Sequence, residues 1–112
     1  MRKTVNVGEI EVPLRASGAT PELYEDYFGQ DLMEDFLTLV DSLNGGEKIQ
    51  GKTLKIVKRM MYIMAKQADN RVSDEYVDWL DQFEDFPVED FAVSVVQLFA
   101  DSLRTKVERK NV

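Results

Sequence analysis

The residues of this chain that could do chemistry are almost all carboxylates. The sequence contains 21 Asp and Glu residues but no His and no Cys, which excludes imidazole bases, thiol nucleophiles, zinc sites and disulfides. Asp78, Asp81 and Asp85 lie close together, but acidic helices produce such groups by chance, and no nucleophile, base or phosphate-binding loop accompanies them. We therefore expect a protein that is not an enzyme and that uses no cofactor or metal.

Length and composition favour one small folded domain over residues 1–112. The chain is 44% apolar and 31% charged, with a net charge of −7, so the charge must lie on a folded body rather than in a disordered tail. The negative charge argues against nucleic acid as a partner. No apolar run approaches the ~20 residues that span a bilayer, and no secretory signal is present. We expect a soluble, cytoplasmic protein that binds another protein and no membrane.

The first element predicted is a β-hairpin over about residues 4–14. In VNVGEIEV, alternating apolar residues flank Gly8 and Glu9, a two-residue turn whose first position suits a type II′ hairpin. Pro13 is expected to end the pairing or to lie on an edge.

Helix signals follow in TPELYEDYFGQDLMEDF. Thr20 can cap a helix that has Pro21 at its first position, Gly29 can end it, and Asp31 can start the next with Glu34 three residues on. Thr53, Ser73 and Pro87 mark three further starts. The predicted helices cover residues 21–28, 32–43, 53–68, 74–83 and 87–107. The fold class is α+β and predominantly helical, with an N-terminal β-hairpin followed by about five helices, two of them short, around one core.

The charges occur in blocks of alternating sign. Every charged residue is acidic over 22–47 and basic over 48–66, and Arg71 is the one positive charge over 69–90. These blocks can be solvated faces of neighbouring helices, or they can orient copies of the chain or a partner. The residues selected from them as partner contacts are Glu22, Glu25, Asp26, Lys52, Lys55 and Arg59.

Two apolar stretches also allow two interpretations. LKIVKRMMYIMAK could be a basic amphipathic helix for a membrane surface or a calmodulin-like partner, but Met also fills cores, and the core interpretation is favoured. Trp79, Phe83 and Phe86 are proposed as the apolar part of a partner contact, because one short helix and the turn after it cannot easily bury three rings. The alternative is that they fill the core beside the last helix.

Three stretches together resemble a known family. VPLRASGATPELYEDYFGQDLMEDF (12–36), MAKQAD (64–69) and WLDQFEDF (79–86) are similar, in this order and spacing, to the tail assembly chaperones of long-tailed phages and prophages of Gram-positive bacteria. The small-residue segment followed by Thr-Pro, Leu-Tyr and Phe-Gly-x-Asp is the most specific part.

The resemblance implies a non-enzymatic function in tail morphogenesis. Such chaperones coat the long, helical, aggregation-prone tape measure protein in the host cytoplasm, are absent from the finished virion and self-associate. The acidic face from Glu22 to Asp41 would then meet basic helices of the tape measure protein or the basic stripe of a neighbouring copy. The alternative function is a phage-encoded acidic adaptor or inhibitor that blocks a basic site on a host protein.

The resemblance also draws attention to the final residues, VERKNV. Many chaperones of this family have a longer form, made by a programmed frameshift, whose second domain recruits the major tail tube protein. Arg109, Lys110 and Asn111 can be encoded by a slippery adenine run, which makes the peptide compatible with such a form. A basic tail that complements the negative end of the last helix is the alternative.

Overall fold

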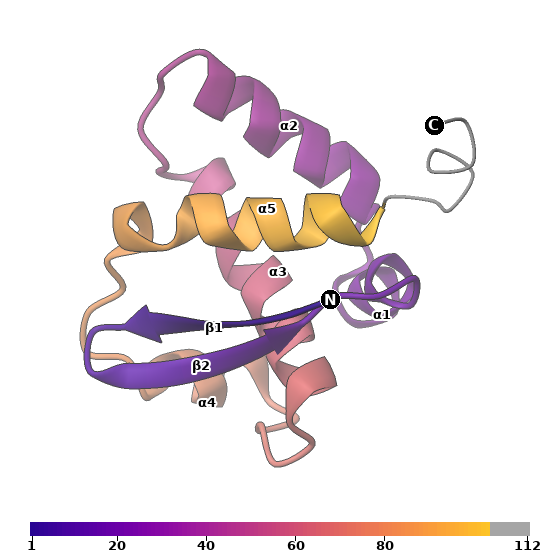
Figure 1. Cartoon of the computed structure of the whole chain (residues 1–112), viewed down its shortest axis with the longest axis vertical. Helices are drawn as coiled ribbons and strands as arrows, with labels where there is room; N and C mark the ends of the chain where they lie inside the picture. Colours follow the sequence, from indigo (N-terminus) through magenta and orange to yellow (C-terminus); the bar gives the residue numbers. More distant parts are fainter. Residues whose placement is uncertain (104–112) are drawn as a thin grey trace, which may run out of the picture.

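The computed structural model describes residues 1–103, and the predicted α+β, mostly helical class is confirmed. An antiparallel hairpin is followed by helices around one core (Figure 1). The elements are β1 (Arg2–Val7), β2 (Ile10–Arg15), α1 (Thr20–Phe28), α2 (Leu32–Asn44), α3 (Lys52–Ala68), α4 (Tyr76–Asp81), the 3₁₀ helix η1 (Val88–Asp90) and α5 (Ala92–Ser102).

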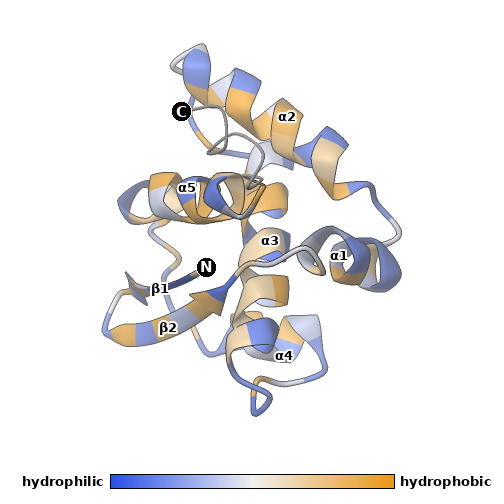
Figure 2. Ribbon diagram, turned by 45° about the vertical axis from the view of Figure 1, so that its right-hand side comes forward, coloured by the Kyte–Doolittle hydropathy of each residue, from blue (hydrophilic) through white to orange (hydrophobic). Residues whose placement is uncertain are grey.

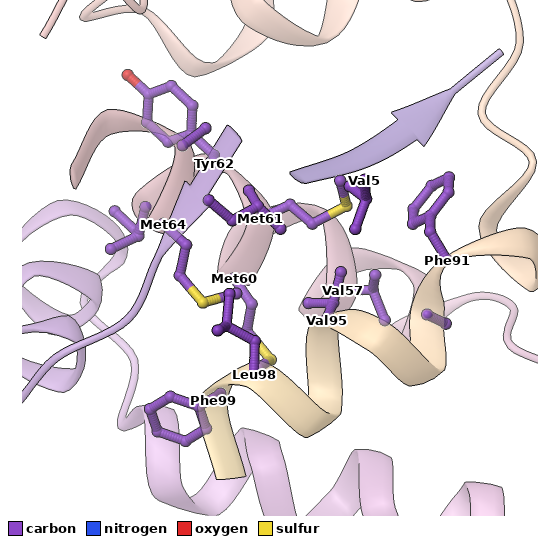
Figure 3. Close-up of a cluster of buried hydrophobic side chains, with 14 of the residues drawn as sticks. Val5, Val57, Met60, Met61, Tyr62, Met64, Phe91, Val95, Leu98 and Phe99 are labelled. Atoms are coloured by element: carbon purple, nitrogen blue, oxygen red, sulfur yellow. The ribbon is translucent and has the colours of Figure 1, made fainter. Parts of the chain in front are cut away.

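The central element is α3, which contacts β2, α1, α2 and α5. It lies behind the hairpin and α5 in Figure 1. Because neighbours cover so much of α3, every residue from Met60 to Ala65 is buried. Met60, Met61 and Met64 point among Val5 of β1 and residues of α5 (Figure 3), so the core interpretation of this methionine-rich helix is correct.

The hairpin begins two residues earlier and ends one residue later than predicted, at Arg2 and Arg15. Val7 pairs with Ile10 across Gly8 and Glu9. Gly8 has φ 62°, whereas Glu9, like the other non-glycine residues of 1–103, has no positive φ. Type I′ would need positive φ at both turn positions, so the geometry agrees with type II′.

Pro13 does not end the strand pairing. It lies opposite Thr4, and the ladder continues to Arg15. Met1 and Ala16 exchange two backbone hydrogen bonds of 2.9 and 3.1 Å. Because bonded and non-bonded pairs alternate in an antiparallel ladder, Thr4 and Pro13 form a non-bonded pair, where the nitrogen of proline points away from β1.

The start of α2 is as predicted, but Thr20 does not cap α1. The Asp31 carboxylate accepts hydrogen bonds from the backbone N–H groups of Met33 (2.8 Å) and Glu34 (3.2 Å). The cap residue of α1 is Ala19, with no side-chain bond. Thr20 is fully buried, and its hydroxyl donates to Oε1 of Gln67 at 2.7 Å. It therefore ties the start of α1 to the end of α3 instead of closing its own helix.

The last two helices are shorter than predicted. The prediction for 74–83 is corrected to Tyr76–Asp81, because Glu75 is extended and the Ser73 hydroxyl accepts from the Glu75 N–H instead of capping the helix. The segment 87–107 does not form one helix. Phe91 breaks it with φ −135°, which places a ring only 2% exposed in the core. Residues 104–107, like Arg109 to Asn111, lie outside the described residues.

Candidate functional site

The three aromatic residues predicted to contact a partner lie mainly in the core. Trp79 is 4% exposed and Phe83 is 9% exposed, while Phe86 is half-buried. They continue a row of rings that starts at Tyr62 of α3, with centroid separations of 5.5 Å (Tyr62–Trp79), 5.0 Å (Trp79–Phe83) and 5.8 Å (Phe83–Phe86). The last ring meets Phe91 edge-on at 5.0 Å.

The reasoning that one short helix could not bury these rings is therefore wrong for Trp79 and Phe83. It considered only α4 and the turn after it, whereas Tyr62 and Phe91 supply aromatic partners from α3 and from the segment before α5. Aromatic pairs at such separations stabilise a core beyond their buried area. Trp79 and Phe83 cannot act as exposed anchors in this conformation.

The charged residues selected from the sequence as partner contacts are exposed, with one exception. Glu22, Glu25 and Asp26 on α1 are exposed, as are Lys52 and Lys55 at the start of α3. Much of α1 is accordingly blue in Figure 2. The exception is Arg59, which is half-buried with its guanidinium 5.3 Å from the centre of the Phe28 ring. Arg59 thus packs between helices, and substituting it would disturb the fold as well as a surface charge.

The opposed charge blocks do not neutralise each other inside the molecule. Within residues 1–103, no salt bridge joins the acidic block 22–47 to the basic block 48–66. Elsewhere in the described residues, Lys66 pairs with Asp74, and Arg71 pairs with Asp69 at 3.0 Å. In each, the cation lowers the pKa of the carboxyl group, mainly through a hydrogen bond. Glu22, Glu25 and Asp26 of α1 and Glu34 and Asp41 of α2 are exposed, and none of them forms a salt bridge within residues 1–103.

One acidic residue of α2 has a different role. Asp35 is only 8% exposed and accepts a 2.7 Å hydrogen bond from the hydroxyl of Tyr24, which is fully buried. Burial, followed by this bond to Asp35, raises the pKa of Tyr24. This contact joins α1 to α2. The sequence does not reveal it, because Asp35 stands among acidic residues such as Asp31 and Glu34 that are exposed.

A shallow apolar groove lies between α1 and α3, and the sequence analysis did not select it. Its volume is about 360 Å³, and its lining consists of Leu23, Asp26, Tyr27, Ile63, Lys66 and Gln67. Leu23 and Tyr27, one turn apart on α1, are 41% and 42% exposed. The signal that could have found them is this pair of large apolar residues at i and i+4 on a helix whose other exposed positions are acidic.

A second, more polar hollow of about 520 Å³ lies between β2 and the segment 69–82. It contains the Arg71–Asp69 pair and Asp78, the one carboxylate of the set Asp78, Asp81 and Asp85 that lines it. Among residues 1–103, no cluster of three or more His, Cys, Asp or Glu side chains could hold a metal ion.

Comparisons with known proteins found no matching family model, no matching curated protein and no matching solved structure. Among the helices of the described residues, none has the length and hydrophobicity to span a bilayer.

Proposed function

We propose that this protein is a tail assembly chaperone that binds the tape measure protein of a long-tailed phage or prophage and keeps it soluble. The observation that carries the proposal is the exposed acidic face of α1 and α2, which no salt bridge within residues 1–103 neutralises. The similarity of residues 12–36, 64–69 and 79–86 to that family is the reason for proposing the tape measure protein as the partner.

The physical requirements of such a chaperone agree with this surface. A coat of many copies must stay soluble while it covers apolar stripes on a long helical protein and later releases them. Exposed carboxylates keep such a coat of many copies soluble and attract basic segments, and they act on encounter and register more than on final affinity. Modest apolar contacts then leave the complex reversible.

The test is co-expression with the tape measure protein encoded in the same gene cluster. We expect that protein to be insoluble alone and soluble with the chaperone present. If it stays equally insoluble, the proposal fails. The alternative function, an acidic adaptor or inhibitor of a host protein, is then supported if pull-down from host lysate recovers one host protein through a basic site.

We also propose that copies self-associate through complementary charge, with the acidic face meeting Lys52 and Lys55 of a neighbour. The double reversal Lys52→Glu and Lys55→Glu should dissociate the oligomer, and high salt should do the same. Arg59 is excluded from the test because it packs on Phe28.

The matched control is the double reversal Arg2→Glu and Arg15→Glu on the outer face of the hairpin, which changes the net charge equally, from −7 to −11, since each reversal contributes −2. Light scattering measures both variants, with circular dichroism to show that they remain folded. An oligomer that persists in the lysine variant, or that dissociates in both variants, contradicts a specific charge contact.

The remaining parts of the proposal concern the longer form and its location. A frameshifted form would recruit the major tail tube protein, and both forms would act in the host cytoplasm and be absent from the mature virion. Residues 109–111 lie outside the described residues, so the support is the sequence alone. An unbroken slippery run in the codons for Arg109 to Asn111, followed by an open frame, is the expected finding in the gene. Its absence rules out slippage there.

A further inference from the structure

We infer that the groove between α1 and α3 docks a helix that carries an apolar stripe flanked by Lys or Arg. The inference names the surface that the proposed chaperone would use, and it rests on that function only for the identity of the natural partner. A groove of about 360 Å³ is at the lower end of what ligand sites offer, and it is shallow rather than enclosed. It suits a few large side chains projecting from a helix rather than an enclosed small molecule.

The apolar wall of the groove is held in place before any partner arrives. The hydroxyl of Tyr27 donates to the backbone carbonyl of Asp74 and accepts from the backbone N–H of Tyr76, both at 3.0 Å. Its ring also packs edge-on against Phe28 at 4.7 Å and Tyr62 at 5.2 Å. A half-exposed ring that is fixed at its polar end loses little conformational freedom on binding, which is the property of an interface anchor.

Leu23 and Ile63 complete the apolar part of the groove. Leu23 lies one turn before Tyr27 on α1, and the almost fully buried Ile63 contributes from α3. The two exposed side chains repeat at i and i+4, which is the spacing at which an amphipathic helix presents its own apolar side chains. Two helices can therefore match side chain against side chain along this groove.

The charge around the groove determines which helix fits. Asp26 lines it, and Glu22 lies one turn earlier on the same exposed helix. Lys66 is the cation of the lining, but the exposed carboxylate of Asp74 pairs with it. The net charge of these four residues is −2, from three carboxylates and one ammonium. An apolar stripe with acidic flanks would be repelled, whereas Lys or Arg flanks would meet carboxylates.

A model peptide tests the site without the natural partner. The probe is a fluorescently labelled helical peptide of Leu, Ala and Lys with leucines at i, i+3, i+4 and i+7, and its counterpart has Glu in place of Lys. We expect the lysine peptide to bind and to shift backbone amide resonances of α1 and of α3 near Ile63. The Leu23→Lys variant should bind it at least about tenfold more weakly, a difference of ~1.4 kcal/mol.

The matched control is Leu37→Lys on α2, a leucine 57% exposed and outside this groove, because it removes the same side chain and adds the same charge. Equal binding by Leu23→Lys and Leu37→Lys, or equal binding of the lysine and glutamate peptides, overturns the inference. If Leu23→Lys dissociates an oligomer of the free protein and the peptide does not compete, the occupant is a second copy and the inference is also wrong.

The same variants separate this inference from the proposed function. If Leu23→Lys keeps the tape measure protein soluble as well as the parent chain does, the inference that the chaperone uses this groove for its partner fails while the chaperone function stands. If the peptide binds in the groove but the parent chain leaves the tape measure protein insoluble, the chaperone function fails while the groove stands.

Discussion

Replacing Trp79 with Ala is expected to lower the free energy of unfolding by ~3–5 kcal/mol, the range for deleting a large aromatic ring from a packed core. The indole is 4% exposed and joins Tyr62 to Phe83, with centroid separations of 5.5 and 5.0 Å. Its loss leaves a cavity between α3 and α4 and removes two ring contacts. For a small domain this is a large part of the total stability. Urea unfolding followed by far-ultraviolet circular dichroism measures the change.

Val77→Ala provides the control on the same helix. Val77 is 71% exposed, so its truncation should change stability by no more than about 0.5 kcal/mol. The comparison also tests the role first assigned to Trp79 from the sequence. If Trp79→Ala retains parental stability and loses only partner binding, the ring is an interface residue and its buried placement is wrong.

Local signals in the sequence were sufficient to predict most elements of the fold. Asp31 caps α2 and Gly29, with φ 70°, ends α1, because both effects depend on residues within one turn. The hairpin turn at Gly8 is local in the same way. The errors occur where distant contacts decide. Thr20 does not cap α1, because its hydroxyl donates to Gln67, which lies 47 positions later in the sequence.

The same distinction between local signals and distant contacts applies to the candidate surfaces. The exposure of Glu22 and Lys52 could be predicted from helix periodicity and charge alone. The burial of Trp79 could not, because it depends on Tyr62, 17 positions earlier in the sequence. The groove needs Leu23 and Ile63 to face each other from two helices, and no pattern within either helix encodes that meeting.

Alkaline conditions are expected to destabilise the protein steeply, and buried tyrosines are the reason. Three of the four tyrosines, Tyr24, Tyr62 and Tyr76, have a pKa raised above the ordinary value of 10, in each case chiefly by burial. For Tyr76 the pKa is raised to about 12. Above pH 10 the folded chain therefore retains phenolic protons that the unfolded chain has released.

The direction of the effect follows from proton linkage. Below pH 10 the phenols are protonated in both states, so they contribute no pH dependence. Above pH 10 the unfolded state binds fewer protons than the folded state, and stability falls as the pH rises; for Tyr76 the fall continues to about pH 12. Each proton of difference corresponds to a slope of ~1.4 kcal/mol per pH unit at most.

The Tyr76→Phe variant isolates the contribution of the Tyr76 phenol. We expect the stability curves of the two proteins to run parallel up to pH 10 and then to diverge, with the phenylalanine variant losing less stability toward pH 12. Tyrosinate absorbance should show one phenol fewer titrating late in the folded variant. Parallel curves over the whole range would mean that the Tyr76 hydroxyl is as accessible in the folded chain as in the unfolded one. The Tyr76 ring would then be packed against Tyr62 less tightly than their centroid separation of 5.3 Å indicates.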